Sequence, residues 1–157
     1  MGIALAVGCL LVLATSTLHY EVLGKLQSTL PRLAMPRRAR LLVVILVAFM
    51  AHAVEISLYG VAYHVMVWHA HLGHMLGLAA PSLTTALYFS AESFTSLGFG
   101  DLTPTGPVRL LAGVEALNGL LLVGWSASFT YLSMERFWKG DDHRPPKEWH
   151  APNPPKL

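Results

Sequence analysis

The chain of 157 residues has room for one domain, and its composition excludes an average soluble protein, since 54% of its residues are hydrophobic and only 13% are charged. The mean hydropathy of +0.49 indicates the same departure. The single cysteine, Cys9, excludes an internal disulfide framework and any metal site built from cysteines alone. The formal net charge of +2 says little by itself, and we expect no nucleic-acid partner.

The first apolar segment covers residues 2–23 and is long enough to cross about 30 Å of hydrocarbon as a helix. A secretory signal peptide is the alternative, but the segment lacks the basic region that such a signal needs. The letters AVGC resemble a lipoprotein cleavage box, yet only five residues precede them, which is too few for an apolar signal core. We therefore expect residues 1–24 to form an extra N-terminal transmembrane helix that is retained.

Basic residues gather in two regions, a predicted loop at residues 25–40 and a predicted tail at residues 136–157. Each region holds five of the eleven lysines and arginines, and only Arg109 lies elsewhere. The positive-inside rule puts both regions in the cytoplasm, so the N-terminus lies outside and the C-terminus inside. We expect an integral protein of a bacterial inner membrane, with a flexible tail rich in proline and charge.

Two further apolar segments are predicted to cross the bilayer, an outer helix at residues 41–65 and an inner helix at residues 107–134. Buried core helices of a soluble protein are the alternative, but too few polar residues remain to cover such a core. The fold class that follows is an all-α membrane protein with three transmembrane helices.

Between these helices, residues 66–107 leave the membrane and return to it, yet they include an apolar stretch at residues 82–95 that is too short to span. The letters APS at residues 80–82 favour a helix start, because proline fits the first turn. The stretch ends in SLGFGD, residues 96–101, which we call the Gly-rich loop. Irregular backbone at membrane depth is tolerated only beside protein or water. We therefore predict a re-entrant helix whose loop lines a water-filled path.

The residue types of the Gly-rich loop suit the removal of water from a cation. Gly98 and Gly100 can adopt backbone angles closed to other residues. Alternating handedness along such a strand turns every carbonyl toward one axis, where carbonyls can replace a cation's hydration shell. The Ser96 hydroxyl can add an oxygen ring at the inner end, while Phe99 packs as a spacer against the short helix. The C-terminal end of that helix is partially negative, which favours a cation beneath it.

This motif resembles the selectivity filter of the potassium-channel pore family, specifically small two-helix channels of the ion-channel-2 type. The family's filter is T-V-G-Y-G-D, and the resemblance covers residues 80–135. Both glycines and the aspartate match outright, while leucine for valine and phenylalanine for tyrosine occur within the family. Serine for threonine keeps the hydroxyl and removes a methyl group. The resemblance implies an ion-binding filter made of Ser96, Leu97, Gly98, Phe99 and Gly100.

The resemblance also implies roles for residues around the filter. Glu92 occupies the place of an acid that pairs with the aspartate after the filter, Asp101, and two such carboxylates would share a proton. Tyr88 occupies the place of an aromatic residue that braces this pair. In the inner helix Gly119 occupies the place of a hinge glycine. By resemblance and helical spacing, the inner cavity is lined by Leu120, Val123 and Ala127.

Other polar residues lie within the apolar segments. His52 and Glu55 are three positions apart on one helix, as are Glu115 and Asn118 on another, and all four lie near mid-membrane. Two roles stay open, a proton-sensitive network that tunes the pore and a buried hydrogen-bond cluster that fixes helix packing, and we favour the second.

The predicted outer loop and its start carry a run of histidines, HVMVWHAHLGH. His71 and His74 could share a helical face and bind zinc or copper, but no spacing there is a specific metal signature. We expect solvated side chains, with His71 and His74 as weak candidates for a metal site.

These features predict one subunit of a potassium-selective channel that conducts K+ passively, with no enzyme activity and no cofactor. A single short helix and loop cannot surround an axis, so the channel must be a homotetramer in the lipid bilayer. A nonselective cation channel is the first alternative, because Ser96 and Leu97 leave the filter geometry open. A membrane haem or metal protein is the second, using His19, His52 and His64, although it leaves SLGFGD unexplained.

Overall fold

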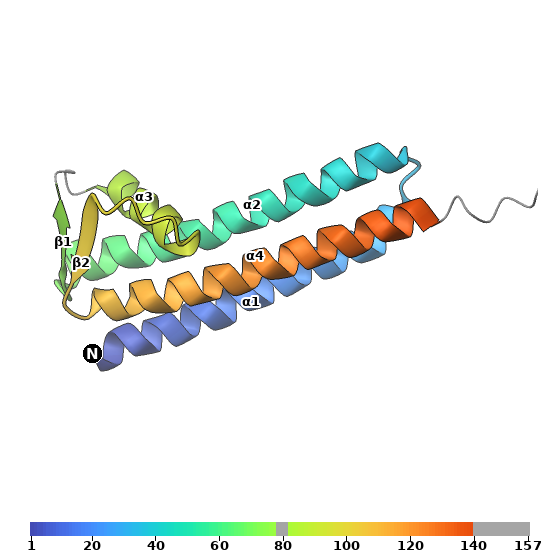
Figure 1. Cartoon of the computed structure of the whole chain (residues 1–157). Coiled ribbons are helices and arrows are strands. Elements are labelled where there is room, and N and C mark those ends of the chain that lie inside the picture. The colour runs from blue at the N-terminus through green and yellow to red at the C-terminus, as the bar shows by residue number, and fades with distance from the viewer. Residues whose placement is uncertain (78–81, 140–157) are drawn as a thin grey trace, which may run out of the picture.

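The computed structural model describes residues 1–77 and 82–139 and is dominated by three long helices that run side by side (Figure 1). These are α1 at Gly2–Thr29, α2 at Arg37–His64 and α4 at Val108–Lys139. Each is long and apolar enough to cross a membrane, with mean hydropathies of 1.9, 2.4 and 1.5 over its most apolar stretch. The predicted helical fold with three apolar membrane helices is therefore confirmed.

The connection between α1 and α2 lies at the opposite end of the bundle from the N-terminus (Figure 1). Helix α1 continues to Thr29, beyond the predicted end at residue 24, because no residue before Pro31 breaks it. A 3-10 turn at Leu30–Arg32 follows, with Pro31 in its first turn. The predicted basic loop is thus partly helical at both ends, since α2 already begins at Arg37.

The short helix α3, Leu83–Phe94, lies between α2 and α4 in the sequence and packs against both. Ser82 caps its start, because the Ser82 Oγ accepts a hydrogen bond from the Thr85 amide at 3.1 Å. On the α2 side Gly60 lets the helices approach closely, since a Cβ there would lie 2.7 Å from a Leu87 methyl group. The predicted start at residues 80–81 lies outside the described residues.

A small antiparallel strand pair joins the two sides of α3, and the sequence did not predict it. Strand β1, His74–Gly77, pairs with β2, Leu102–Thr105, with His74 opposite Thr105. Helix α2 reaches this region through a π-helical turn at Val65–His69. The strands therefore add a short β element to one end of a helical fold, and they hold the segments before α3 and after the Gly-rich loop together.

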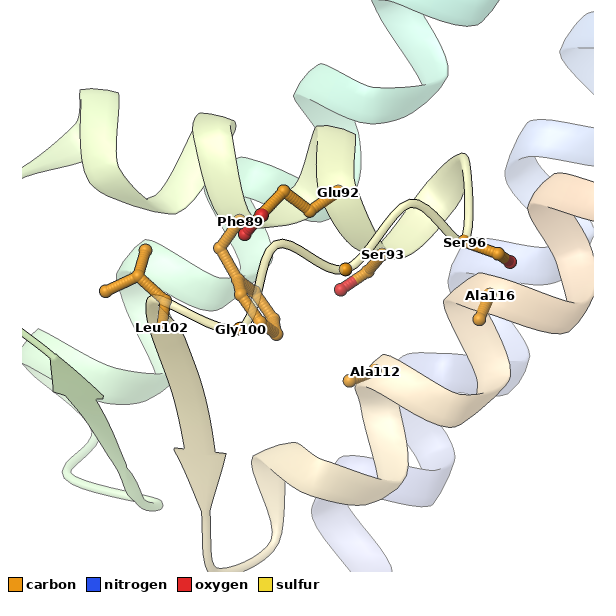
Figure 2. A pocket seen from close by; sticks show the side chains of 9 residues that line it. Phe89, Glu92, Ser93, Ser96, Gly100, Leu102, Ala112 and Ala116 are labelled. Atoms are coloured by element: carbon orange, nitrogen blue, oxygen red, sulfur yellow. The ribbon is translucent and has the colours of Figure 1, made fainter.

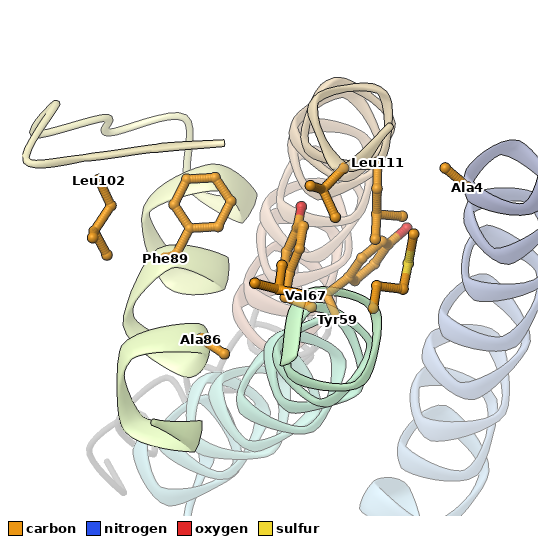
Figure 3. Close-up of a cluster of buried hydrophobic side chains, with 10 residues drawn as sticks. Ala4, Tyr59, Val67, Ala86, Phe89, Leu102 and Leu111 are labelled. Carbon is orange, nitrogen blue, oxygen red and sulfur yellow. The ribbon is translucent and has the colours of Figure 1, made fainter. Parts of the chain in front are cut away.

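A buried apolar cluster, the larger of the two among the described residues, joins α1, α2, α3, α4 and β2 (Figure 3). Tyr59 of α2 and Leu111 of α4 meet there, and Phe89 of α3 covers them from the other side. Outside this cluster many large apolar side chains of the long helices are exposed in the single chain, including Leu10, Phe49 and Leu121. Lipid or further copies of the chain must cover such surfaces in a membrane. The predicted tail begins within α4, because residues 136–139 are helical, and residues 140–157 lie outside the described residues.

Candidate functional site

The Gly-rich loop connects α3 to β2 and runs past the first turns of α4 (Figure 2). All of residues 96–101 are exposed in the single chain. Between the loop and α4 lies an open pocket of about 230 Å³. Its walls come from α3, the loop, β2 and α4: Phe89, Glu92, Ser93, Ser96, Gly98, Gly100, Leu102, Ala112 and Ala116.

The backbone of the loop alternates in handedness. Ser96, Gly98 and Gly100 have φ angles of 55°, 57° and 81°, whereas Leu97 and Phe99 between them have no positive φ. A positive φ is uncommon for a residue with a side chain, so Ser96 shows that the loop geometry overrides the preference of its residue type. Alternating handedness is what the two glycines predict for this loop.

Hydrogen bonds tie the loop to the end of α3. The Glu92 side chain is almost fully buried, and its Oε1 accepts a hydrogen bond from the Phe99 amide at 2.8 Å. The Leu97 amide donates to the Glu92 carbonyl and the Ser96 amide to the Ser93 carbonyl, both at 3.0 Å. The direct hydrogen bond expected between Glu92 and Asp101 is not formed in the single chain. The returning loop brings the Phe99 amide to Glu92, while Asp101 is exposed.

Tyr88 of α3 contacts the Gly-rich loop through its ring. Its ring stacks on Phe99, with centroids 6.3 Å apart and planes at 4°. Desolvation, followed by the carboxylates of Asp101 and Glu92, raises the pKa of Tyr88 to about 12. The hydroxyl therefore stays protonated at physiological pH, and it can donate to these carboxylates. Phe99 thus packs against a residue of α3, and its role as a spacer in a filter stays a prediction.

Behind α3, the buried carboxylate of Glu115 joins three helices. Its Oε2 accepts a hydrogen bond from the Tyr63 hydroxyl at 2.6 Å, and its Oε1 accepts one from the Ser90 hydroxyl at 2.5 Å. Ser90 also donates to the Ile56 carbonyl at 2.7 Å. Since both carboxylate oxygens are satisfied, this arrangement fits a cluster that fixes helix packing.

Asn118 makes separate contacts, although it lies only three positions from Glu115. Its amide nitrogen donates to the Thr15 hydroxyl at 2.8 Å and to the Tyr59 hydroxyl at 3.2 Å. Asn118 therefore links α4 to α1 and α2. The sequence analysis missed the partners Thr15, Tyr59, Tyr63 and Ser90, although an isolated polar residue within an apolar helix is itself a signal.

A second buried carboxylate, Glu55, lies between two histidines. Glu55 Oε1 is 2.8 Å from His19 Nδ1, and Oε2 is 2.8 Å from His52 Nδ1. His64 is not part of this group, because its ring lies against Trp68 and His69 at centroid distances of 5.1 and 5.2 Å. The structure thus separates the trio His19, His52 and His64 that a haem protein was expected to use.

The outer histidines His71 and His74 are exposed, and the His74 carbonyl accepts a hydrogen bond from the Thr105 hydroxyl at 3.2 Å. Among the described residues, the one group of three side chains that could hold a metal ion is His19, His52 and Glu55.

Gly119 marks the point where α4 touches the end of α3. A Cβ at this position would lie 2.0 Å from the Phe94 carbonyl oxygen and 2.8 Å from its carbonyl carbon. Close packing therefore requires glycine here, whether or not the helix bends, and α4 runs through Gly119 without interruption. The three residues expected at the inner cavity are exposed in the single chain: Leu120, Val123 and Ala127.

Comparisons with known proteins identify related sequences. A family model described as an ion channel matches residues 41–135, more than half of the chain. The inward rectifier potassium channel Kirbac3.1 of Paramagnetospirillum magnetotacticum is 36% identical over 66 residues, which are 41% of this chain and 22% of that protein. The chain thus matches about a fifth of the length of this relative. No solved structure matches the chain.

Proposed function

We propose that this chain, which belongs to the ion channel family, is one subunit of a homotetrameric channel that conducts K+ selectively and passively. A channel makes and breaks no covalent bond, so the chain is not an enzyme. The observation that carries the choice of ion is the alternation of φ along Ser96, Gly98 and Gly100. Rings of backbone carbonyls are the ligands that potassium-selective filters use in place of the hydration shell.

The exposure of the loop supports the tetramer. Leu97 and Phe99 are 61% and 67% exposed in the single chain, although both are large and apolar. One loop offers carbonyls from one side, and a dehydrated cation needs oxygen ligands all around it. Four copies around an axis supply these ligands, and they also cover Leu97 and Phe99. Repulsion between successive ions then helps each ion to leave.

Residues below the loop fit the same assembly. Helix α3 ends at Phe94, directly before the loop, so its partially negative end favours a cation on the inner side. Leu120, Val123 and Ala127 of α4 would line the cavity there, and Gly119 would serve as the hinge. The apolar wall would leave a cation in that cavity hydrated until it reaches the Ser96 hydroxyls.

The positions of the N-terminus and of the α1–α2 connection support an outside N-terminus and a cytoplasmic C-terminus. The N-terminus lies at the end of the bundle that carries the strand pair, and the α1–α2 connection lies at the other (Figure 1). Arg32 and Arg38 belong to that connection and its flanks, which the positive-inside rule places in the cytoplasm. The strand pair then faces outward, and a bacterial inner membrane is the expected location.

A nonselective cation channel is the second candidate, because Ser96 and Leu97 leave the filter geometry open. Serine lacks the methyl group of the threonine in the family filter, which removes packing at the innermost site. Reversal potentials in mixed K+ and Na+ separate the two candidates. A reversal potential near the K+ equilibrium value supports selectivity, and one near zero shows that the filter does not distinguish the ions.

The test of the proposal is ion flux in liposomes that contain the purified chain. We expect a K+ gradient to drive flux that barium blocks, with much less flux in an equal Na+ gradient. The particle mass in mild detergent should correspond to four chains. Flux from a monomer or dimer would contradict the assembly, and no K+ flux from a correctly assembled tetramer would contradict the function.

A further inference from the structure

We propose that His19, His52 and Glu55 form a binding site for a divalent transition-metal ion of the zinc type within the membrane. None of these residues belongs to the filter or the cavity of the proposed K+ path. They come from α1 and α2, so the site would connect the extra N-terminal helix to the rest of the chain.

Geometry is the first observation. One imidazole nitrogen from each histidine and a Glu55 oxygen all lie within 4.8 Å of one another. The side chains of His19 and Glu55 are fully buried, and that of His52 is 17% exposed. The ligand atoms of a tetrahedral zinc site, each about 2.0–2.2 Å from the metal, lie roughly 3.4 Å apart, so a metal ion can occupy this group once the three side chains adjust around it.

The second observation concerns the protons. His19 Nδ1 faces Glu55, and His19 Nε2 lies 3.2 Å from the Ser126 hydroxyl. A neutral imidazole has one N–H group. When this N–H group is on Nε2 and donates to Ser126, the lone pair of His19 Nδ1 faces Glu55 Oε1 at 2.8 Å. In that tautomer the Nδ1 lone pair can take a metal ion, and Ser126 would orient the ligand as supporting partners do in metal sites. In the other tautomer, which the metal ion would displace, Nδ1–H donates to Glu55 and the Ser126 hydroxyl donates to Nε2.

The third observation is the type of ligand and the surroundings. Two imidazole nitrogens and one carboxylate oxygen suit zinc and similar transition metals and leave a fourth position open, whereas Ca2+ and Mg2+ prefer oxygen ligands alone. The neighbours of the two histidines are rings: Trp125 lies 5.3 Å from His19, and Phe94 lies 5.7 Å from His52. Among the described residues no lysine or arginine pairs with Glu55, so a bound cation would supply its counter-charge.

The position of the site gives it a consequence for conduction, and this part rests on the proposed channel function. Phe94 is the last residue of α3, and its carbonyl touches α4 at Gly119. A metal ion would fix α1 and α2 beside this contact, directly before the Gly-rich loop. Zn2+ is therefore expected to change the flux of the reconstituted channel at concentrations that fill the site.

Binding itself is measured without any flux. The full chain is stripped with a chelator, titrated with Zn2+ by calorimetry, and loaded with Co2+, whose visible absorption reports its coordination geometry. We expect one metal ion per chain. His19→Gln and Glu55→Gln should each weaken binding more than Ser126→Ala, which leaves every ligand in place and should cost about 10–100-fold. The double variant His71→Gln/His74→Gln is the matched control and should bind as the unaltered chain does.

Three outcomes would overturn the site. The first is the absence of stoichiometric Zn2+ binding by the unaltered chain, which would leave a proton as the shared cation. The second is loss of binding in the outer-loop control together with normal binding in His19→Gln. The third is unchanged Zn2+ affinity in both Ser126→Ala and Glu55→Gln, when both variants have the same elution profile as the unaltered chain. Normal binding with no K+ flux would instead contradict the proposed function and leave the metal site standing.

Discussion

The Gly-rich loop and the buried polar residues of the long helices differ in whether their polar groups have hydrogen-bond partners. Among the described residues, no backbone hydrogen bond reaches a carbonyl of residues 96–100. In the helices, by contrast, both oxygens of Glu55 and both oxygens of Glu115 have partners within 2.8 Å. Paired groups fix one arrangement of the helices, whereas unpaired carbonyls are available to an ion.

The two regions also differ in how the sequence specifies them. The loop depends on backbone angles, and glycine is the residue that supplies them. The helix contacts depend on single polar side chains such as Asn118, which link segments far apart in the chain. Changes in the loop should therefore affect conduction first, and changes in the helices should affect stability first. The following expectations test this separation, beginning with the largest effect.

Gly98→Ala should abolish K+ flux. The φ of Gly98 is 57°, which strains a residue with a side chain, and four added methyl groups would crowd the axis of the tetramer. No atom of the same chain lies within 4 Å of the added Cβ, so the folded chain should lose only the cost of the backbone strain, about 1–2 kcal/mol. Liposome flux and thermal melting in detergent measure the two quantities. Gly24→Ala in α1, where the added Cβ also meets nothing, is the control and should conduct normally. Selective flux from an assembled Gly98→Ala tetramer would contradict the filter assignment.

Gly119→Ala should lower stability as well as flux, because its Cβ would lie 2.0 Å from the Phe94 carbonyl oxygen. Separating α4 from the end of α3 should cost about 1–3 kcal/mol, as for other overpacked sites. The measurement is the melting temperature of the detergent-solubilised protein. In the control Gly113→Ala, on the same helix, nothing lies within 4 Å and the melting temperature should stay equal or rise. Equal melting temperatures for both variants would show that α3 and α4 do not pack as described.

Tyr63→Phe should lower stability and leave conduction nearly unchanged. The substitution removes the donor at 2.6 Å from Glu115 and leaves one carboxylate oxygen without its partner. The expected loss is about 1–3 kcal/mol, measured by thermal melting. Tyr131→Phe, at an exposed position of α4, is the matched control and should change little. A loss of selectivity in Tyr63→Phe at unchanged stability would instead support the proton-sensitive role that the sequence left open.

Much of the fold could be predicted because length and composition decide it. An apolar run either is or is not long enough to span a bilayer, so α1, α2 and α4 could be recognised, with ends shifted by no more than five residues. The pairing of β1 with β2 could not, because four-residue strands carry no clear alternation and their partners lie on either side of α3. The π-helical turn at Val65–His69 had no sequence signal either.

In the candidate site the glycines allowed the backbone of the loop to be anticipated, since few other residues adopt a positive φ. The positive φ of Ser96 had no such signal, because the surrounding loop imposes it. The contact between His19 and Glu55 was also hidden, since only the packing of α1 against α2 brings them together. The contact between Glu92 and the Phe99 amide could not be predicted, because it depends on the path of the whole loop backbone and no single residue determines that path.

The smallest effect is expected from Glu92→Ala, which removes the acceptor of the Phe99 amide and keeps every carbonyl of the loop. Permeation should survive, because the ion ligands are unchanged. The loop should lose its side-chain tie to α3, so the decay of current during sustained opening should change.

Glu92→Gln is the informative control, since its amide oxygen can still accept from the Phe99 amide but it cannot share a proton with Asp101 as a carboxylate pair would. Currents of Glu92→Gln that resemble those of the unaltered channel would assign the role to the Phe99 contact. Currents that resemble Glu92→Ala would assign it to the charge or proton that Glu92 shares with Asp101 in the assembled tetramer. Single-channel recording from pH 5 to 8 distinguishes these outcomes, and unchanged open times with unchanged conductance in both variants would exclude Glu92 from control of the loop. A change in conductance alone would mean that Glu92 acts on the ion path itself, and the separation between the conducting loop and its supporting residues would then fail at this position.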